Sequence, residues 1–291
     1  HTHKRPPTEI AEIAGLYRSV CSDLMRARAL GCQLDLIAHL DGLTARAHDA
    51  LYGTRPYRID RVWTFLSEGF PKVVRRSWRP VALASLLFYG PLLITAIGTL
   101  IHADLAAAIL PKAMLRAMAQ SYAEGFDGRD FGADSTMAGF YVYNNIGIAF
   151  RCFATGVLFG LGSLFFLVYN GLVIGAVLGY VIHLGHGGNI LTFICGHGPF
   201  ELTAITISGA AGLKMGWALV ATEGKSRIAS LRAQAPDLVQ LVLGAAVMLA
   251  IAALIEGYWS PSGLPAPVKW AASAVFSATL ITYFVFAGRR R

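Results

Sequence analysis

Residues 141–219 are almost uninterruptedly apolar and rich in glycine, and this stretch admits very few folds. A helix crosses a bilayer with roughly 20 apolar residues, so the stretch is long enough for about three crossings. Small residues four apart leave bare backbone on one helix face, where membrane helices approach closely. We therefore predict the core of an integral membrane protein, whose helices pack through Gly156, Gly160, Gly171, Gly175, Gly179, Ser208, Gly212 and Gly216.

Composition and charge distribution agree with a membrane location. The chain is 55% hydrophobic and 14% charged, whereas soluble domains carry about 25% charged residues. Of its 25 lysine and arginine residues, 13 lie in residues 1–79, against 8 acidic residues there. Basic residues beside a span mark the cytoplasmic side and attract anionic lipid. We expect a lipid bilayer as partner, with anionic lipid at the basic N-terminal segment, and no nucleic acid.

About six crossings are expected, and the second is a long run that tilts or begins at the interface. Tyr169-Asn170-Gly171 is typical of a turn, and residues 183–198 are expected to form an irregular connection. Six crossings with basic flanks place both termini in the cytoplasm of a bacterium, at its inner membrane. The expected crossings are 81–101, 139–168, 172 onward, 199–221, 238–255 and 270–286.

The chain before the first crossing is expected to form two further parts. Residues 1–56 carry apolar residues at helical spacing on both sides of Gly31, which predicts a cytoplasmic helical hairpin. Residues 57–79 are basic, apolar on one side and tryptophan-bearing, which predicts an amphipathic interfacial helix. The alternative for this segment is a soluble helix packed on the hairpin. Residues 80–291 complete an all-α, polytopic membrane helix bundle.

Six polar residues are expected to form an intramembrane network: Asn144, Asn145, Arg151, Asn170, His197 and Glu201. A charge in hydrocarbon costs several kcal/mol and needs a partner. One hypothesis pairs Arg151 with Glu201, or bonds Glu201 to Asn144 or Asn145. In the alternative, Arg151 extends to the cytoplasmic surface and Glu201 caps its own helix near the outer surface.

The sequence contains no complete catalytic or metal-binding motif that would indicate an enzyme. His183, His186 and His197 could supply three zinc ligands, with Glu201 as general base. The spacing is not that of HExxH, however, and no nucleophile elbow, phosphate loop or dinucleotide fingerprint is present. Four scattered cysteines are expected to stay as free thiols. We therefore expect no catalytic residues, no metal and no cofactor.

Several segments together resemble the stage II sporulation protein M family, also called the DUF95 family. They are Leu16-Tyr17-Arg18, Asn144-Asn145 before Gly156 and Gly160, Asn170-Gly171 before Gly175, and residues 197–201 before residues 209–213. The resemblance covers most of the chain. It implies a multi-spanning bacterial membrane protein without established catalysis, in an envelope-related assembly. The long basic N-terminal region departs from the sporulation member, so a sporulation role does not carry over.

Three functions follow as expectations. The first is a non-enzymatic scaffold or subunit of a membrane complex, which forms a homodimer and binds other proteins. The second is a transporter or channel subunit with a polar path around Glu201 and Arg151. The third is a metal-dependent membrane hydrolase.

Overall fold

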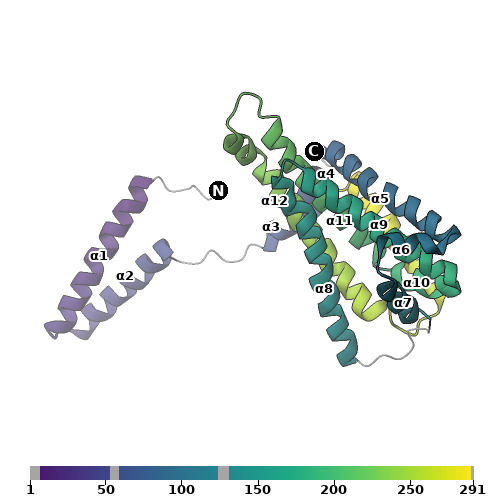
Figure 1. Ribbon diagram of the computed structural model, residues 1–291. Helices are drawn as coiled ribbons and strands as arrows, with labels where there is room; N and C mark the ends of the chain where they lie inside the picture. Colours follow the sequence, from purple (N-terminus) through teal and green to yellow (C-terminus); the bar gives the residue numbers. More distant parts are fainter. Residues whose placement is uncertain (1–6, 53–58, 124–130, 290–291) are drawn as a thin grey trace. The chain divides into compact units, whose positions relative to one another are not determined.

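The computed structural model describes residues 7–52, 59–123 and 131–289 (Figure 1). These residues are almost entirely helical and contain no strand, as the all-α prediction requires. The chain divides into two compact units, residues 1–62 and 63–291. The elements are α1 Pro7–Ala29, α2 Leu34–Tyr52, α3 Ile59–Thr64, η1 Phe65–Gly69, α4 Phe70–Arg76, α5 Trp78–Ile101, η2 Ala103–Leu105, α6 Ala106–Ile109, α7 Lys112–Ser121, α8 Phe131–Ala154, η3 Thr155–Val157, α9 Leu161–Val181, η4 Ile182–His186, α10 Gly187–Ile194, α11 Gly198–Val220, α12 Arg227–Leu254, η5 Ile255–Trp259 and α13 Ala266–Phe286.

The first unit contains the α1–α2 hairpin. Gly31 has a positive φ of 60°, which lets the chain reverse between the helices. Leu24 and Ala27 are buried between them, and Arg28 pairs with Asp41 at 3.0 Å. The boundary predicted at residue 56 between the hairpin and the next part lies outside the described residues.

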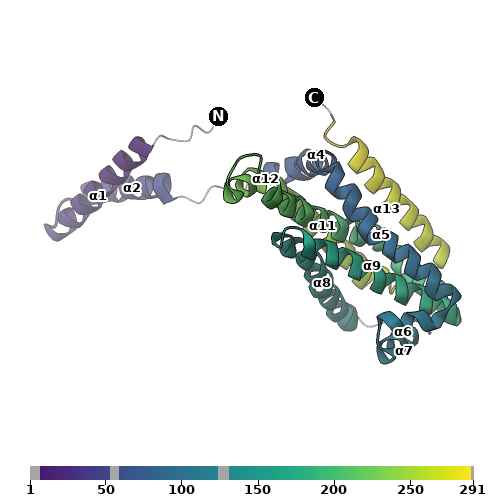
Figure 2. The same ribbon diagram turned by 45° about the horizontal axis from the view of Figure 1, so that its top comes forward.

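Helix α11 lies at the centre of the second unit, which we call the bundle (Figure 2). It contacts α5, α8, α9, α12 and α13, and each residue from Ala204 to Gly212 is buried. A helix that is apolar around its whole circumference can be buried on every side by other helices. In the outer helices α5 and α13, by contrast, few residues are fully buried.

Helices α5 and α9 run parallel and touch through glycine. A β-carbon at Gly171 would overlap the carbonyl oxygen of Phe88, and one at Gly175 or Gly179 would overlap the next turns of α5. The hydroxyl of Thr99 lies 3.4 Å from the Ala176 carbonyl oxygen on α9. The four-residue glycine period therefore fits one backbone against another.

A second glycine contact joins the turn before α9 to α11. A β-carbon at Gly156 would overlap the backbone of Gly212, and one at Gly216 would overlap the backbone of Gly160. Gly160 has φ 85° and reverses the chain between α8 and α9. Ser208 is also buried on α11. All eight expected packing positions are thus accounted for inside a single chain.

Two local predictions are wrong. The break between α8 and α9 lies at residues 155–160, whereas Tyr169-Asn170-Gly171 continues α9. Gly171 is small because Phe88 lies against it, and packing, not turn formation, explains the glycine there. Residues 183–198, expected to be irregular, contain η4 and α10, with a kink at Gly185.

The helix predicted over residues 57–79 is divided: its described part contains a π-helical turn at η1 and a break at Ser77. Phe70, Val73 and Val74 are buried in the core of the bundle. Arg75 donates hydrogen bonds to the carbonyl oxygens of Phe284 and Ala287, at 2.8 and 2.7 Å. The end of α13 therefore lies beside α4, and we call this part of the bundle the α4 end.

The α4 end also holds two ion pairs that share Asp237. Asp237 on α12 accepts from Arg76 and, at 2.6 Å, from Lys214 on α11. Lys214 also reaches Ser77 at 3.1 Å. These contacts join α4, α11 and α12 at a basic surface.

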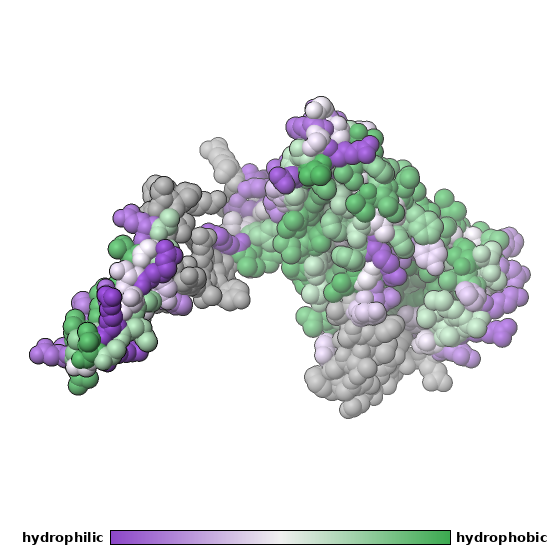
Figure 3. Space-filling view, turned by 60° about the vertical axis from the view of Figure 1, so that its left-hand side comes forward, coloured by the Kyte–Doolittle hydropathy of each residue, from purple (hydrophilic) through white to green (hydrophobic). Residues whose placement is uncertain are grey.

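In the described part of the chain, five helical segments are long and apolar enough to span a membrane: Trp78–Ile101, Leu161–Ile194, Gly198–Val220, Arg227–Trp259 and Ala266–Phe286. Apolar side chains cover much of the visible face of the bundle, and hydrophilic ones gather mainly towards its ends (Figure 3). So large an apolar surface is typical of lipid contact. Helix α8 is long enough for a sixth crossing, which stays a prediction because its first half carries no described side chains.

The α5–α9 contact predicts that adding one methyl group at Gly171 destabilises the protein. We expect Gly171→Ala to lower stability by about 1–3 kcal/mol, because the new carbon forces the helices apart. Gly90→Ala on α5 is the control, since no atom lies within 4 Å of a β-carbon there. The measurement is the melting temperature of both purified variants in mild detergent. Equal melting temperatures would contradict backbone contact at Gly171.

Candidate functional site

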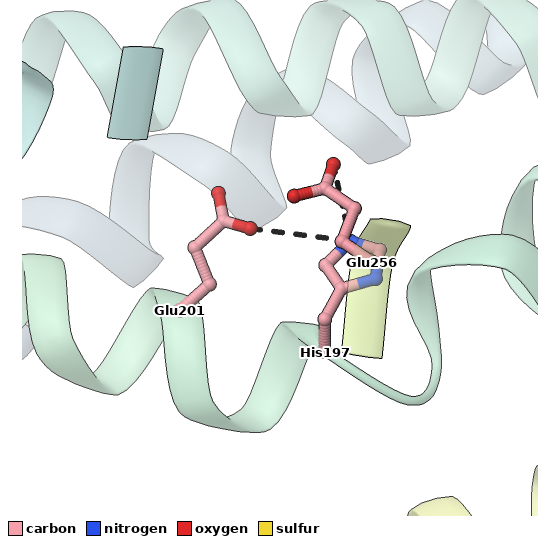
Figure 4. A group of neighbouring side chains, drawn as sticks. All are labelled: His197, Glu201 and Glu256. Atoms are coloured by element: carbon pink, nitrogen blue, oxygen red, sulfur yellow. Dashed lines mark ion pairs between the residues drawn. The ribbon is translucent and has the colours of Figure 1, made fainter. Parts of the chain in front are cut away.

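The end of the bundle opposite α4 contains a buried cluster of three ionisable side chains, His197, Glu201 and Glu256 (Figure 4). His197 immediately precedes α11, and Glu201 lies one turn later on the same face. Pro199 in the first turn suits a helix start because it has no N–H to leave unsatisfied. Glu256 lies in η5, a π-helical turn that continues α12. Two separate helices thus bring the three side chains together.

The geometry of this cluster is compact. His197 Nε2 lies 3.9 Å from Glu201 Oε2 and 3.8 Å from Glu256 Oε1. One nitrogen or oxygen atom from each residue lies within 4.8 Å of those of the other two. The side chains of His197, Glu201 and Glu256 retain 5%, 13% and 8% of their exposure. Both carboxylates are directed towards the same edge of the imidazole ring.

Neighbouring polar groups orient the cluster. His197 Nδ1 is hydrogen-bonded to Ser260 Oγ at 3.1 Å, which leaves Nε2 towards the carboxylates. Asn145 on α8 donates to Glu256 Oε2 at 3.4 Å. Lys269 on α13 donates to the Ser260 carbonyl oxygen at 2.7 Å. Helices α8 and α13 therefore support a site formed by the ends of α11 and α12.

The electrostatics of the cluster are unfavourable as it stands. Two carboxylates close together in a region of low dielectric repel each other and lose hydration. Within the described part of the chain, the only ion-pair partner of either carboxylate is His197. A buried carboxylate pair becomes stable when it shares a proton or a cation. The arrangement is therefore suited to holding positive charge.

The imidazole of His197 lies between the hydroxyl of Ser260 and the carboxylate of Glu201, as in the triad of a serine hydrolase. The arrangement nevertheless does not support that chemistry. Ser260 is 1% exposed, so its hydroxyl is not accessible to a substrate. Both carboxylates lie beyond hydrogen-bonding distance of Nε2. Ser260 instead orients the imidazole ring.

The structure assembles part of the network expected from sequence. Asn145, His197 and Glu201 meet at the cluster, and the exposed Asn144 donates to Asn145 at 3.2 Å. Arg151 is exposed and bonds to Gly147 of its own helix, so it does not pair with Glu201. Asn170 is buried and bonds to Phe166 in α9.

The histidine set considered for zinc is not assembled. His183 is exposed, and its Nδ1 lies 2.8 Å from the Leu100 carbonyl oxygen. Neither His183 nor His186 belongs to the group around His197 in the described residues. The zinc site considered from sequence is therefore wrong in its ligands.

Sequence reasoning missed Glu256, Ser260 and Lys269, none of which was among the expected site residues. Glu256 directly follows the long apolar run of α12. An acidic residue at the end of an apolar run is a candidate for an intramembrane site. That signal was available in the sequence, although the partner of Glu256 was not.

Comparison with known proteins now places the chain in a family. A family model described as stage II sporulation protein M matches residues 84–261, which is more than half of the chain. The chain belongs to the stage II sporulation protein M family. The matched stretch includes Asn145, the three cluster residues and Ser260, but not Lys269. A second model, described as a domain of unknown function (DUF8413), matches residues 2–53.

One relative has a curated sequence. An uncharacterized protein of Methanocaldococcus jannaschii is 30% identical over 121 residues, which cover 40% of this chain and 67% of the relative. No solved structure matches the chain.

The hydrogen bond between Ser260 and His197 leads to a prediction. We expect Ser260→Ala to lower stability by about 1–3 kcal/mol, because a buried imidazole nitrogen loses its partner. Ser262→Ala is the control, since its hydroxyl donates to the carbonyl oxygen of Trp259 in the preceding turn. Chemical unfolding in detergent compares the two variants. The assignment of Ser260 as the orienting residue is wrong if both lose the same free energy.

Proposed function

We propose that this stage II sporulation protein M family member is a non-enzymatic subunit of a membrane complex. The bundle anchors the protein, and the α1–α2 hairpin binds a partner protein. The observation that carries the proposal is the division of the chain into two compact units. The two family models follow the same division: one matches residues 2–53, within the first unit, and the other matches residues 84–261, within the second.

The surface of the hairpin supports a binding role. Its tip exposes Leu30 and Leu34, at 78% and 83% of their surface. Both leucines flank the turn at Gly31, where side chains project from a short connection. Exposed apolar residues grouped at a tip gain free energy when a partner covers them. We therefore place the partner contact at residues 30–34, which we call the hairpin tip.

A transporter or channel subunit is the second candidate. Glu201 and Glu256 favour it, because ionisable residues inside membrane helices often mark an ion path. The low exposure of the cluster favours a closed site over a path. We therefore rank the complex subunit first. A homodimer stays a prediction, and the eight small residues do not argue for it because they are used inside one chain.

We further propose an inner-membrane location with both termini in the cytoplasm. Support comes from the basic α4 end, where Lys214, Arg75 and Arg76 lie near the end of α13. Positive residues beside spans stay on the cytoplasmic side. The His197 cluster then lies towards the outer surface.

The hairpin proposal is tested with the full chain, purified from native membranes after mild crosslinking. We expect Leu30→Asp/Leu34→Asp to lower recovery of specific co-purifying proteins about tenfold, equivalent to about 1.4 kcal/mol of binding. Gln33→Asp is the matched control, because it adds charge at the tip and keeps both leucines. Equal recovery with all three proteins, or a wild type that purifies alone, would refute a partner at the tip.

Topology is tested by cysteine labelling in cells, with Cys21 and Cys32 replaced by serine. We expect a membrane-impermeant maleimide to label Ala266→Cys in intact cells, and Lys225→Cys only after permeabilisation. Both positions are exposed: Lys225 lies just before the start of α12, and Ala266 begins α13, beyond the far end of α12. The reversed pattern would place the termini outside.

A further inference from the structure

We propose that His197, Glu201 and Glu256 bind one divalent transition-metal ion, which joins the start of α11 to the end of α12. This metal site is independent of the proposed partner binding at the hairpin tip. It also differs in ligands from the three-histidine set considered from sequence.

The distances within the cluster fit a shared ion better than direct contact. The separations of 3.8 and 3.9 Å between Nε2 and the carboxylates are too long for hydrogen bonds. Zinc binds imidazole nitrogen and carboxylate oxygen at about 2.0–2.2 Å, so two ligands on one ion lie up to about 4 Å apart. One atom from each of the three residues already lies within 4.8 Å of the others. Small rotamer changes would complete the ligand set.

The donor types also select the class of ion. Imidazole nitrogen suits zinc, iron, nickel and copper, whereas calcium and magnesium prefer oxygen ligands alone. Two carboxylates supply the charge that balances a divalent cation. An ion would therefore take the place of the proton that otherwise relieves the repulsion between Glu201 and Glu256. Three protein ligands leave further coordination positions open.

The cluster residues make hydrogen bonds of the kind that metal-binding side chains usually make in proteins. A ligating histidine commonly uses its other ring nitrogen in a hydrogen bond, and here Nδ1 bonds to Ser260. A ligating carboxylate is likewise hydrogen-bonded, and here Asn145 holds Glu256. His197 is 4% exposed, with Nε2 directed at both carboxylates. A buried imidazole oriented in this way is a second observation beside the acidic pair.

A structural role follows from the position of the site. The three ligands come from helix ends that are far apart in sequence, and an ion between them would hold those ends together. Glu201 keeps 13% of its surface, which leaves a route for the ion. The buried ligands leave little room for a substrate. We therefore infer that the ion joins the start of α11 to the end of α12.

The test uses the full chain in nanodiscs, stripped with a chelator and then titrated with zinc. We expect the wild type to bind one zinc ion per chain and its melting temperature to rise by about 5 °C or more at hundredfold excess over Kd. Cobalt is a second probe, because its visible absorption reports coordination by nitrogen and oxygen directly.

Glu256→Gln and His197→Gln are the test variants, and His183→Gln is the control. We expect Glu256→Gln to bind zinc at least about tenfold more weakly, and to match or exceed the wild type in melting temperature without metal, because one buried charge is gone. That comparison separates loss of a ligand from loss of the fold. A wild type that binds no more zinc than the two test variants would overturn the proposal. So would an equal loss in His183→Gln, or the same zinc-induced rise in melting temperature in Glu256→Gln as in the wild type.

Discussion

Contact between one helix backbone and another at glycine sets the spacing of the bundle. Lipid gives no hydrophobic force to drive helices together, so close packing has to supply the association energy. Gly171, Gly175 and Gly179 fit α9 against α5, and Gly212 and Gly216 fit α11 against the turn before α9. Helix α11 touches both sets of neighbours, so its position constrains those of α5, α8, α9, α12 and α13.

Two clusters of ionisable side chains lie at opposite ends of the bundle. At the α4 end, Lys214 and Asp237 form an ion pair with opposite charges already matched. At the other end, His197, Glu201 and Glu256 bring two negative groups together with one imidazole. The first arrangement is complete within the protein, whereas the second needs a proton or a cation. This difference in charge balance makes the second cluster the better candidate for a ligand.

The division of the chain into a hairpin unit and a bundle suggests separate roles for the two parts. The hairpin is small and exposes Leu30 and Leu34, whereas the bundle buries its small residues and exposes its apolar surface to lipid. The stage II sporulation protein M model matches most of the bundle, and a separate family model matches the hairpin. A partner-binding hairpin on a membrane anchor accounts for both facts. A cation in the bundle would add rigidity to the anchor.

The sequence alone determined the fold class, the membrane location, the hairpin and most of the spans. Apolar length and glycine period are local properties, and they survive in any arrangement of the helices. Glycine itself was ambiguous, since the same residue serves a turn at Gly160 and a helix contact at Gly171. The break between α8 and α9 was therefore misplaced.

The composition of the site depended on tertiary structure. His197 and Glu201 are one turn apart, so their proximity follows from helix geometry. Glu256 lies 55 residues beyond Glu201, and only the packing of α12 on α11 brings it to the same place. Arg151 and Glu201 formed a reasonable pair by charge, yet Arg151 is exposed and bonds within its own helix. Charge identifies which residues need a partner, and the packing of the helices decides which partner each one meets.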